Sequence, residues 1–285
     1  MTLENSLWKV EELGGGAYLF RWFKGFYLSL FLDTSDGVVA TDPIDAAAAR
    51  AYRQAIASVT DAPIRAIIYS HDHRDHIVGA SELSETAEVF AHSNAKTRIE
   101  RRKDQDIRMP QTLIGDGDVL RFGKHKIEAR YFGPNHSDSN LAMTTETGNG
   151  RLLVFVDTVE PGVAPYRDLP DTDFAGTIDS LRAAEKLDFN RVIGGHCGPE
   201  KREWVTWYRE YLEDLRDATR SAFEKTNGQT PLSGEDGVHM TERIFNEVCR
   251  AAAVAIKPKY GHWRGFDQWA PMTANRILMY LIMGN

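Results

Sequence analysis

Cysteine is scarce in this chain. Cys197 and Cys249 are its only two cysteines in 285 residues, and neither belongs to a spacing typical of metal-binding cysteines. Two cysteines cannot provide the disulfide framework on which small secreted domains depend. We therefore expect a core of buried apolar side chains, for which a chain of this length has enough material.

Long apolar segments are also missing. The longest run, Ile277–Met283, is much shorter than the roughly 20 residues that a membrane-spanning helix needs. Residues 1–6 contain neither the basic segment nor the apolar segment of a signal peptide. The sequence thus predicts no membrane partner and a cytoplasmic location.

Clusters of basic residues are nearly absent, and the formal net charge is −7. The one short run, Arg101-Arg102-Lys103, ends a helical pattern, and we interpret it as a solvated helix face. Binding to nucleic acid requires a basic surface, so we exclude nucleic acid as a partner and expect a small-molecule substrate. A homo-oligomer remains an open alternative.

Two regions differ in their patterns. Residues 1–201 alternate strand-like and helix-like segments and are predicted to form a catalytic core. Residues 202–285 are predicted to form a helical C-terminal extension that packs on the core as part of one structural unit. In this extension we expect a helix over 241–255 that Lys257-Pro258 ends, and a last helix over about 272–283.

The most informative stretch is Ser70–His76, where three histidines and two aspartates fall within six residues. Residues 64–69 before it have the composition of a short buried strand, so the cluster is expected on the loop that follows. Imidazole and carboxylate groups are good ligands for zinc and other divalent metals. Because so many ligands would crowd one ion, two neighbouring ions are a better match.

The spacing His-x-His-x-Asp-His resembles the signature of the metallo-β-lactamase superfamily. Its other ligand motifs follow in order, each beside a strand-like segment: His136 within Gly133–Asn140, Asp157 after Leu152–Val156, and His196 after Arg191–Gly195. The resemblance covers roughly the first two-thirds of the chain. It implies an α/β fold, the αββα metallo-β-lactamase sandwich, with the metals at one edge.

Carried over residue by residue, the resemblance implies two metal sites. The first would be held by His71, His73 and His136. The second would be held by Asp75, His76 and His196, with Asp157 bridging both. The two divalent ions are expected to be zinc, with iron or manganese as alternatives.

One aspartate outside these motifs is a further candidate. Asp42 ends the strand-like segment 38–41, where the family commonly has an aspartate next to the metals. We predict that Asp42 orients a ligand histidine, with a plain strand-end turn as the alternative.

Such a site implies hydrolysis, in which a hydroxide that bridges the two metals attacks the carbonyl of a lactone, ester or thioester. Asp75 is predicted to be catalytic, because it could accept a hydrogen bond from that hydroxide. Aspartate at position 157 is what the lactonase and thioesterase branches use. Glu160 stands where the largest β-lactamase branch has a lysine that binds the substrate carboxylate, and an acid there would repel it.

Two alternatives of the same fold stay open, a β-lactamase-type amide hydrolase and an iron-dependent oxidoreductase. The diiron flavoproteins of the family replace a first-motif histidine with glutamate, whereas this chain keeps His73. Metal analysis and an oxygen-uptake assay would distinguish a mononuclear iron enzyme from a hydrolase. A binding module without activity is disfavoured, because no ligand of the motif set is missing.

Residues 259–269 are predicted to be an aromatic-rich loop of the extension. We predict that Trp263, Phe266 and Trp269 line the substrate pocket, since aromatic rings offer a large apolar contact area at small entropic cost. The alternative is that these rings only pack the extension onto the core.

Overall fold

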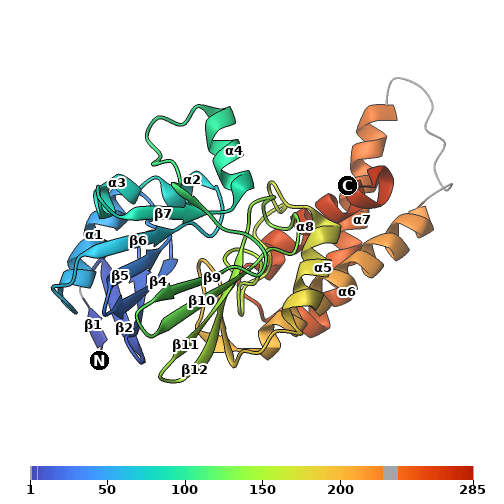
Figure 1. The fold of residues 1–285 in the computed structure, drawn as a ribbon. Coiled ribbons are helices and arrows are strands. Elements are labelled where there is room, and N and C mark those ends of the chain that lie inside the picture. Colours follow the sequence, from blue (N-terminus) through green and yellow to red (C-terminus); the bar gives the residue numbers. More distant parts are fainter. Residues whose placement is uncertain (1, 5, 227–236, 285) are drawn as a thin grey trace.

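Two β-sheets lie face to face in the computed structural model, which describes residues 2–4, 6–226 and 237–284 (Figure 1). The first sheet has eight strands in chain order: β1 (Thr2–Glu4), β2 (Trp8–Gly14), β3 (Ala17–Trp22), β4 (Tyr27–Thr34), β5 (Gly37–Thr41), β6 (Ile64–Ile68), β7 (Glu88–Ala91) and β8 (Thr112–Leu113). The second has six, in the order β14 (Glu200–Lys201), β13 (Arg191–Ile193), β12 (Gly150–Val154), β11 (Ala142–Thr147), β10 (His125–Arg130) and β9 (Val119–Phe122).

Strand direction decides where the loops of the site gather. In the first sheet β5, β6, β7 and β8 pair in parallel, so their carboxyl ends meet at one edge. In the second sheet β12 and β13 pair in parallel, whereas the other pairs are antiparallel. Loops that leave parallel strands on the same side are a common place for a functional site.

Helices cover the outer faces of both sheets. The four of the first half are α1 (Ala46–Ala57), α2 (Arg74–Ile77), α3 (Ala80–Leu83) and α4 (Ser93–Arg102). The four of the second half are α5 (Phe174–Ala184), α6 (Glu203–Thr226), α7 (Gly237–Tyr260) and α8 (Phe266–Met283), which lie beyond the second sheet (Figure 1). This layering is the αββα sandwich that the sequence predicted.

Three apolar clusters hold the layers together. One lies between the two sheets, one between the first sheet and its helices, and one between the second sheet and α5–α8. Strand β3 shows how the sequence achieves this, because Leu19 belongs to the cluster between the sheets whereas Phe20 stacks on Tyr52 of α1 at 4.4 Å. Alternate side chains of one strand therefore serve two cores.

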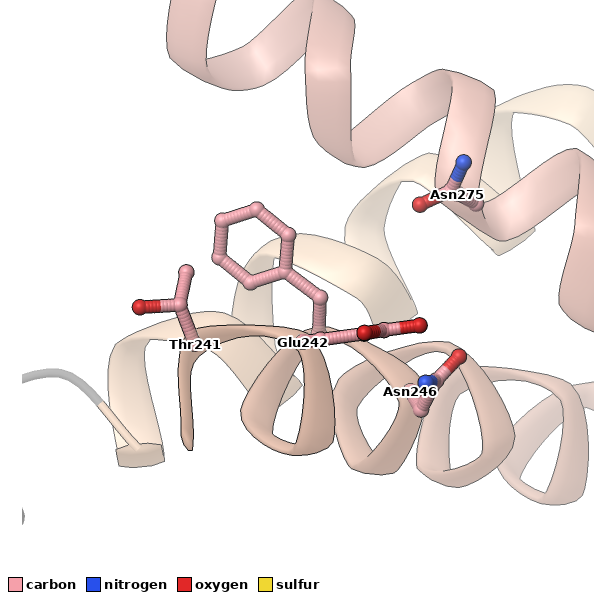
Figure 2. Close-up of a pocket in the computed structure, with 5 residues that line it drawn as sticks. Thr241, Glu242, Asn246 and Asn275 are labelled. Atoms are coloured by element: carbon pink, nitrogen blue, oxygen red, sulfur yellow. The ribbon is translucent and has the colours of Figure 1, made fainter. Parts of the chain in front are cut away.

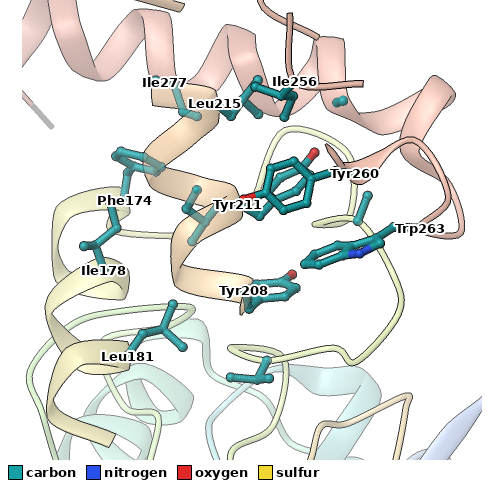
Figure 3. Close-up of a cluster of buried hydrophobic side chains, with 14 of the residues drawn as sticks. Phe174, Ile178, Leu181, Tyr208, Tyr211, Leu215, Ile256, Tyr260, Trp263 and Ile277 are labelled. Carbon is teal, nitrogen blue, oxygen red and sulfur yellow. The ribbon is translucent and has the colours of Figure 1, made fainter. Parts of the chain in front are cut away.

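The cluster beside the second sheet joins residues from both sides of the predicted boundary at 201 and 202. Phe174 and Ile178 of α5 pack with Tyr211 of α6 and Ile277 of α8 (Figure 3). All four side chains are buried. The boundary between core and extension stays an interpretation of the sequence pattern, since one apolar cluster crosses it.

The predicted ends of the last two helices were wrong. Helix α7 continues through Pro258 to Tyr260, and α8 begins at Phe266 with Pro271 inside it. The aromatic loop therefore shrinks to residues 261–265. A proline removes the hydrogen bond to the residue four positions earlier, here Val254 and Asp267. Both residues are exposed, so water can replace the missing bond.

The extension also contains a cavity of about 520 Å³ between α7 and α8 (Figure 2). Its lining residues are Thr241, Glu242, Phe245, Asn246 and Asn275. None of the predicted metal ligands lines it. Among the helices of the described residues, none is both long and apolar enough to cross a membrane.

Candidate metal centre

The predicted ligands come together from five segments. His71 and His73 lie on the loop after β6, and His76 lies in α2, which follows that loop. The other three follow strands of the second sheet: His136 lies between β10 and β11, Asp157 after β12, and His196 after β13. Residues far apart in sequence thus meet at one edge of the sandwich.

The first ligand group consists of His71, His73, His136 and Asp157, whose ligand atoms all lie within 4.8 Å of one another. His136 Nε2 lies 3.0 Å from His73 Nδ1. Asp157 Oδ2 lies 3.3 Å from His136 Nε2 and 3.9 Å from His71 Nε2. Three imidazoles and one carboxylate oxygen therefore face a common centre.

The second group consists of His76, Asp157 and His196. His76 Nε2 lies 3.1 Å from Asp157 Oδ2, and His196 Nε2 lies 3.4 Å from Asp157 Oδ1. Asp157 belongs to both groups, and its two oxygens face different partners. Its backbone has φ +58°, a conformation that costs energy for a residue with a side chain and is often found at functional sites.

Asp75 is not in either group. Its side chain is 55% exposed, and its Oδ2 lies 3.8 Å from His76 Nε2 while accepting a 2.9 Å hydrogen bond from the Tyr27 hydroxyl. The Tyr27 ring lies 4.5 Å from the His196 ring. Ligation by Asp75 stays a prediction, and Tyr27 is a residue of the site that the sequence reasoning missed.

The buried polar atoms of the two groups fit a divalent metal. His71 Nε2, His76 Nε2 and Asp157 Oδ1 are buried without a hydrogen-bond partner among the described residues. A buried polar atom without a partner is costly, and nearly all such atoms in proteins are satisfied. His71 Nε2 belongs to the first group and His76 Nε2 to the second, and Asp157 Oδ1 faces His196, so a cation held in each group would satisfy these atoms.

The protonation states of His71, His136 and Asp157 also suit metal binding, whereas at His76 burial lowers the pKa but the carboxylates of Asp157 and Asp42 raise it well above its usual value. Burial and the neighbouring histidines lower the pKa of His71 well below its usual value. Burial lowers the pKa of His136 to about 4, so its imidazole is neutral at pH 7. Burial alone would raise the pKa of Asp157, but the histidines around it hold that pKa well below its usual range. Neutral imidazole and ionised carboxylate are the ligand forms.

A hydrogen-bonded chain behind His71 selects its metal-facing nitrogen. The Ser70 hydroxyl donates to Asp42 Oδ2 at 2.6 Å and lies 2.8 Å from His71 Nδ1. Because its one hydrogen points to Asp42, Ser70 must accept from the Nδ1–H of His71, which leaves Nε2 for a metal. Asp42 Oδ2 also lies 3.6 Å from His76 Nδ1. This geometry supports the predicted orienting role of Asp42.

The two variable positions of the histidine motif have other contacts. Asp72 is buried and accepts hydrogen bonds from the hydroxyls of Ser139 and Ser137 at 2.7 and 3.0 Å, and Arg102 donates to it as well. Asp72 thereby ties the loop that carries His71 and His73 to the segment that carries His136. Arg74 instead bonds Asp104 and Asp106 outside the ligand groups.

Glu160 lies beneath the loop that carries His196. Its carboxylate accepts hydrogen bonds from the backbone N–H groups of Gly195 at 2.7 Å and His196 at 3.1 Å. Burial raises its pKa to about 7, so its negative charge is partly lost near neutral pH. The carboxylate is engaged with the backbone, which weakens the argument that Glu160 repels a β-lactam.

Cys197, next to His196, is a poor nucleophile. Burial raises the pKa of its thiol to about 12, and its Sγ lies 3.0 Å from the Arg264 guanidinium. Because the thiolate is the reactive form, the thiol is inert at neutral pH. Chemistry at this site does not run through Cys197.

The predicted pocket residues lie mainly in the core. Trp263 is 5% exposed and Phe266 is 2% exposed. Trp263 stacks on Tyr211, with ring centroids 5.1 Å apart and planes 14° apart (Figure 3). These two rings therefore match the alternative prediction, in which they pack the extension onto the core. Trp269 is only partly buried and meets the exposed Tyr166 ring at 5.1 Å.

Comparison with known proteins agrees with this geometry. A family model of the metallo-beta-lactamase superfamily matches residues 30–196. The 2,4-dinitroanisole O-demethylase subunit alpha of Nocardioides sp. (strain JS1661) is 32% identical over 202 residues, which cover 68% of this chain but only 58% of that relative. The chain therefore spans less than two-thirds of that relative's length.

Two further matches are more distant. The hydroxyacylglutathione hydrolase of Synechococcus sp. (strain CC9902) is 23% identical over 220 residues, covering 70% of this chain and 81% of that protein. The crystal structure of a metallo-beta-lactamase from Hirschia baltica superposes with a TM-score of 0.61 at 19% identity, covering 73% of this chain and 98% of the other. This last likeness shows the fold alone.

The layered fold carries two groups of histidine and aspartate that are able to hold metal. The chain belongs to the metallo-β-lactamase superfamily.

Proposed function

We propose that this protein is a dinuclear metal-dependent hydrolase that acts on the carbonyl of a lactone, ester or thioester. The observation that carries this proposal is the sharing of Asp157 by two adjacent ligand groups. His71, His73 and His136 would hold the first ion, and His76, His196 and Asp75 the second. Zinc is the expected metal, with iron or manganese as alternatives.

Two divalent ions in these positions would act as Lewis acids and would lower the pKa of bound water to about 7. The chain's own residues set the spacing of the two groups and provide the catalytic carboxylate. Asp157 spaces the two groups, because one oxygen faces His196 and the other faces His76 and His136. Asp75 is the catalytic candidate, since its exposed carboxylate beside His76 can accept a proton from the attacking water.

Tyr27 restrains that carboxylate through its hydroxyl. No covalent intermediate on Cys197 is required, because its thiol is buried and protonated. The reaction is therefore direct attack by water, and the substrate is a small molecule that carries an activated carbonyl. The name of one relative describes it as a subunit. Our proposal therefore includes an assembly of more than one chain. Size-exclusion chromatography with light scattering tests this part of the proposal.

The test is a hydrolysis screen of the metal-loaded protein against lactones, thioesters, aryl esters and β-lactams. We expect turnover of at least one of the first three classes and a large loss in Asp157→Ala. Activity confined to β-lactams would replace the proposal with an amide hydrolase. Oxygen uptake with iron-loaded protein, together with no hydrolysis, would replace it with an oxidoreductase.

A second candidate is demethylation of an aryl methyl ether. The relative at 32% identity is named as the alpha subunit of a 2,4-dinitroanisole O-demethylase. Adding 2,4-dinitroanisole and unsubstituted anisole to the screen separates this activity, because release of a dinitrophenolate is visible by its absorbance. Turnover of 2,4-dinitroanisole, together with no turnover of the esters in the screen, would favour this second candidate.

A further inference from the structure

The loop between β12 and α5 contains a carboxylate that contacts a predicted metal ligand from outside. Asp171 Oδ2 lies 3.0 Å from His73 Nε2. The other nitrogen of that ring, Nδ1, lies 3.0 Å from His136 Nε2 inside the first ligand group. His73 therefore turns one nitrogen to the metal side and the other to Asp171.

This arrangement decides which nitrogen can bind a metal. An imidazole that donates its Nε2–H to a carboxylate has its lone pair on Nδ1. His71 has the opposite arrangement, because its Nδ1–H goes to Ser70 and its Nε2 faces the group. Two histidines on one short loop thus need opposite tautomers, and a separate partner fixes each of them.

Asp171 is itself held in place. The Arg98 guanidinium donates to both of its carboxylate oxygens, at 2.9 and 2.7 Å. Arg98 also bonds Asp138 at 2.9 Å and pairs with the buried Asp72 at 3.2 Å. One arginine of α4 therefore fixes Asp171 relative to both loops that supply the histidines of the first ligand group.

The backbone around Asp171 does not fold this way without support. Arg167, Leu169 and Asp171 have φ values of +51°, +51° and +63°, in the left-handed region that residues with side chains rarely adopt. Several such residues in one short loop persist only where the surrounding structure holds them.

The C-terminal extension supplies that support. The buried Thr273 hydroxyl of α8 donates to the Arg167 carbonyl at 2.9 Å, and Arg276 donates to the Thr172 carbonyl at 2.6 Å. At the other end of the loop, Ala164 N–H donates to the Arg264 carbonyl at 2.9 Å. Helix α8 and the turn before it therefore fix the loop along its length.

We propose that Asp171 is a positioning residue that makes His73 an Nδ1 metal ligand, and that the extension takes part in the metal site by holding the loop that carries Asp171. The inference rests on the metal site of the proposed function but not on any substrate. It gives the extension a role in metal binding in addition to its packing on the second sheet.

The test measures metal affinity by competition with a chromophoric chelator, using zinc, and records the visible spectrum of the cobalt-substituted protein. We expect Asp171→Asn to weaken zinc binding about 10- to 100-fold and to alter the cobalt spectrum, the usual loss when an outer partner of a ligand histidine is removed. The control is Asp168→Asn, which makes the same change on the exposed part of the same loop. It should stay within about twofold of the parent.

The variant Thr273→Val tests the extension, because it removes one hydroxyl of α8 and keeps the shape. We expect a weaker loss of zinc affinity in the same direction. If Asp171→Asn binds zinc as tightly as Asp168→Asn does, the positioning role is overturned. It is also overturned if Asp171→Asn lowers the melting temperature of the metal-free protein while its zinc affinity stays unchanged. A normal affinity in Thr273→Val, beside a loss in Asp171→Asn, would overturn the part assigned to the extension. These measurements use no substrate. A failed hydrolysis screen would therefore count against the proposed reaction and not against this inference.

Discussion

Replacing Tyr27 with phenylalanine removes one hydroxyl at the metal centre and keeps the ring against His196. The lost hydroxyl donates to Asp75 Oδ2 at 2.9 Å. A hydrogen bond to a charged group contributes about 1.5–3 kcal/mol when it is protected from water. Asp75 is 55% exposed, so water replaces part of the bond, and we expect a loss of about 1 kcal/mol. That is about a fivefold decrease in kcat/KM.

The assay compares kcat/KM of the metal-loaded variant and parent on the best substrate of the screen, together with zinc affinity. Tyr18→Phe is the matched control, because Tyr18 lies on the neighbouring strand and stacks on Phe31, away from the ligands. It should stay within about twofold of the parent. Equal values for Tyr27→Phe and Tyr18→Phe would refute the reasoning. A decrease of more than about 100-fold would also refute it, because Tyr27 would then act on the substrate itself.

Four other outcomes follow from the structure. Asp157→Ala should weaken the second metal more than the first and lower turnover at least about 100-fold, as elemental analysis and kinetics can show; unchanged metal content would mean that another residue bridges. Trp263→Ala should cost about 3–5 kcal/mol and roughly 10 °C of melting temperature with normal kinetics, whereas a change of substrate preference in Trp269→Ala at near-normal stability would place that ring in the pocket. Removing metal with a chelator should lower the melting temperature by several degrees, and an unchanged value would contradict metal binding by the folded state. Burial raises the pKa of Cys249 to about 11, so alkylation of this thiol at pH 8 should be at least about 100-fold slower than in the denatured chain, with mass spectrometry as the readout.

Six of the seven predicted ligands lie in the two groups, and the sequence could indicate them because each belongs to a short motif of the family that it resembles. His71 and His73 follow β6, Asp157 follows β12 and His196 follows β13, and parallel strands bring such ends to one edge of a sheet. The resemblance implied the layers, and the alternation of strand-like and helix-like segments agrees with them. What the pattern could not show was the direction of Asp75, which depends on a hydroxyl from a distant strand.

Other features had no sequence signal at all. Tyr27 reads as one more aromatic residue of a strand, and Asp171 lies in a polar loop that resembles any solvated turn. The roles of both depend on which tertiary neighbours they meet. The helix ends failed for a related reason, because a proline weakens a helix but does not always end it, and α7 continues through Pro258 where the freed carbonyl belongs to the exposed Val254. Trp263 shows the same limit, since an aromatic ring can pack a core or line a cleft with the same composition.

The division of ligands between the two sheets has a consequence for how the protein is made. His71, His73 and His76 leave the ribosome early, whereas Asp157 follows β12 and His196 follows β13 of the second sheet. A chain interrupted before residue 157 would have the three histidines of the first group but not the carboxylate that the two groups share, nor His196 of the second group. The ligands of both groups are therefore complete only when the chain has been made through His196 and the two sheets have docked. Two bound ions would report that both sheets are in place, whereas a product that ends before residue 157 would lack the second site.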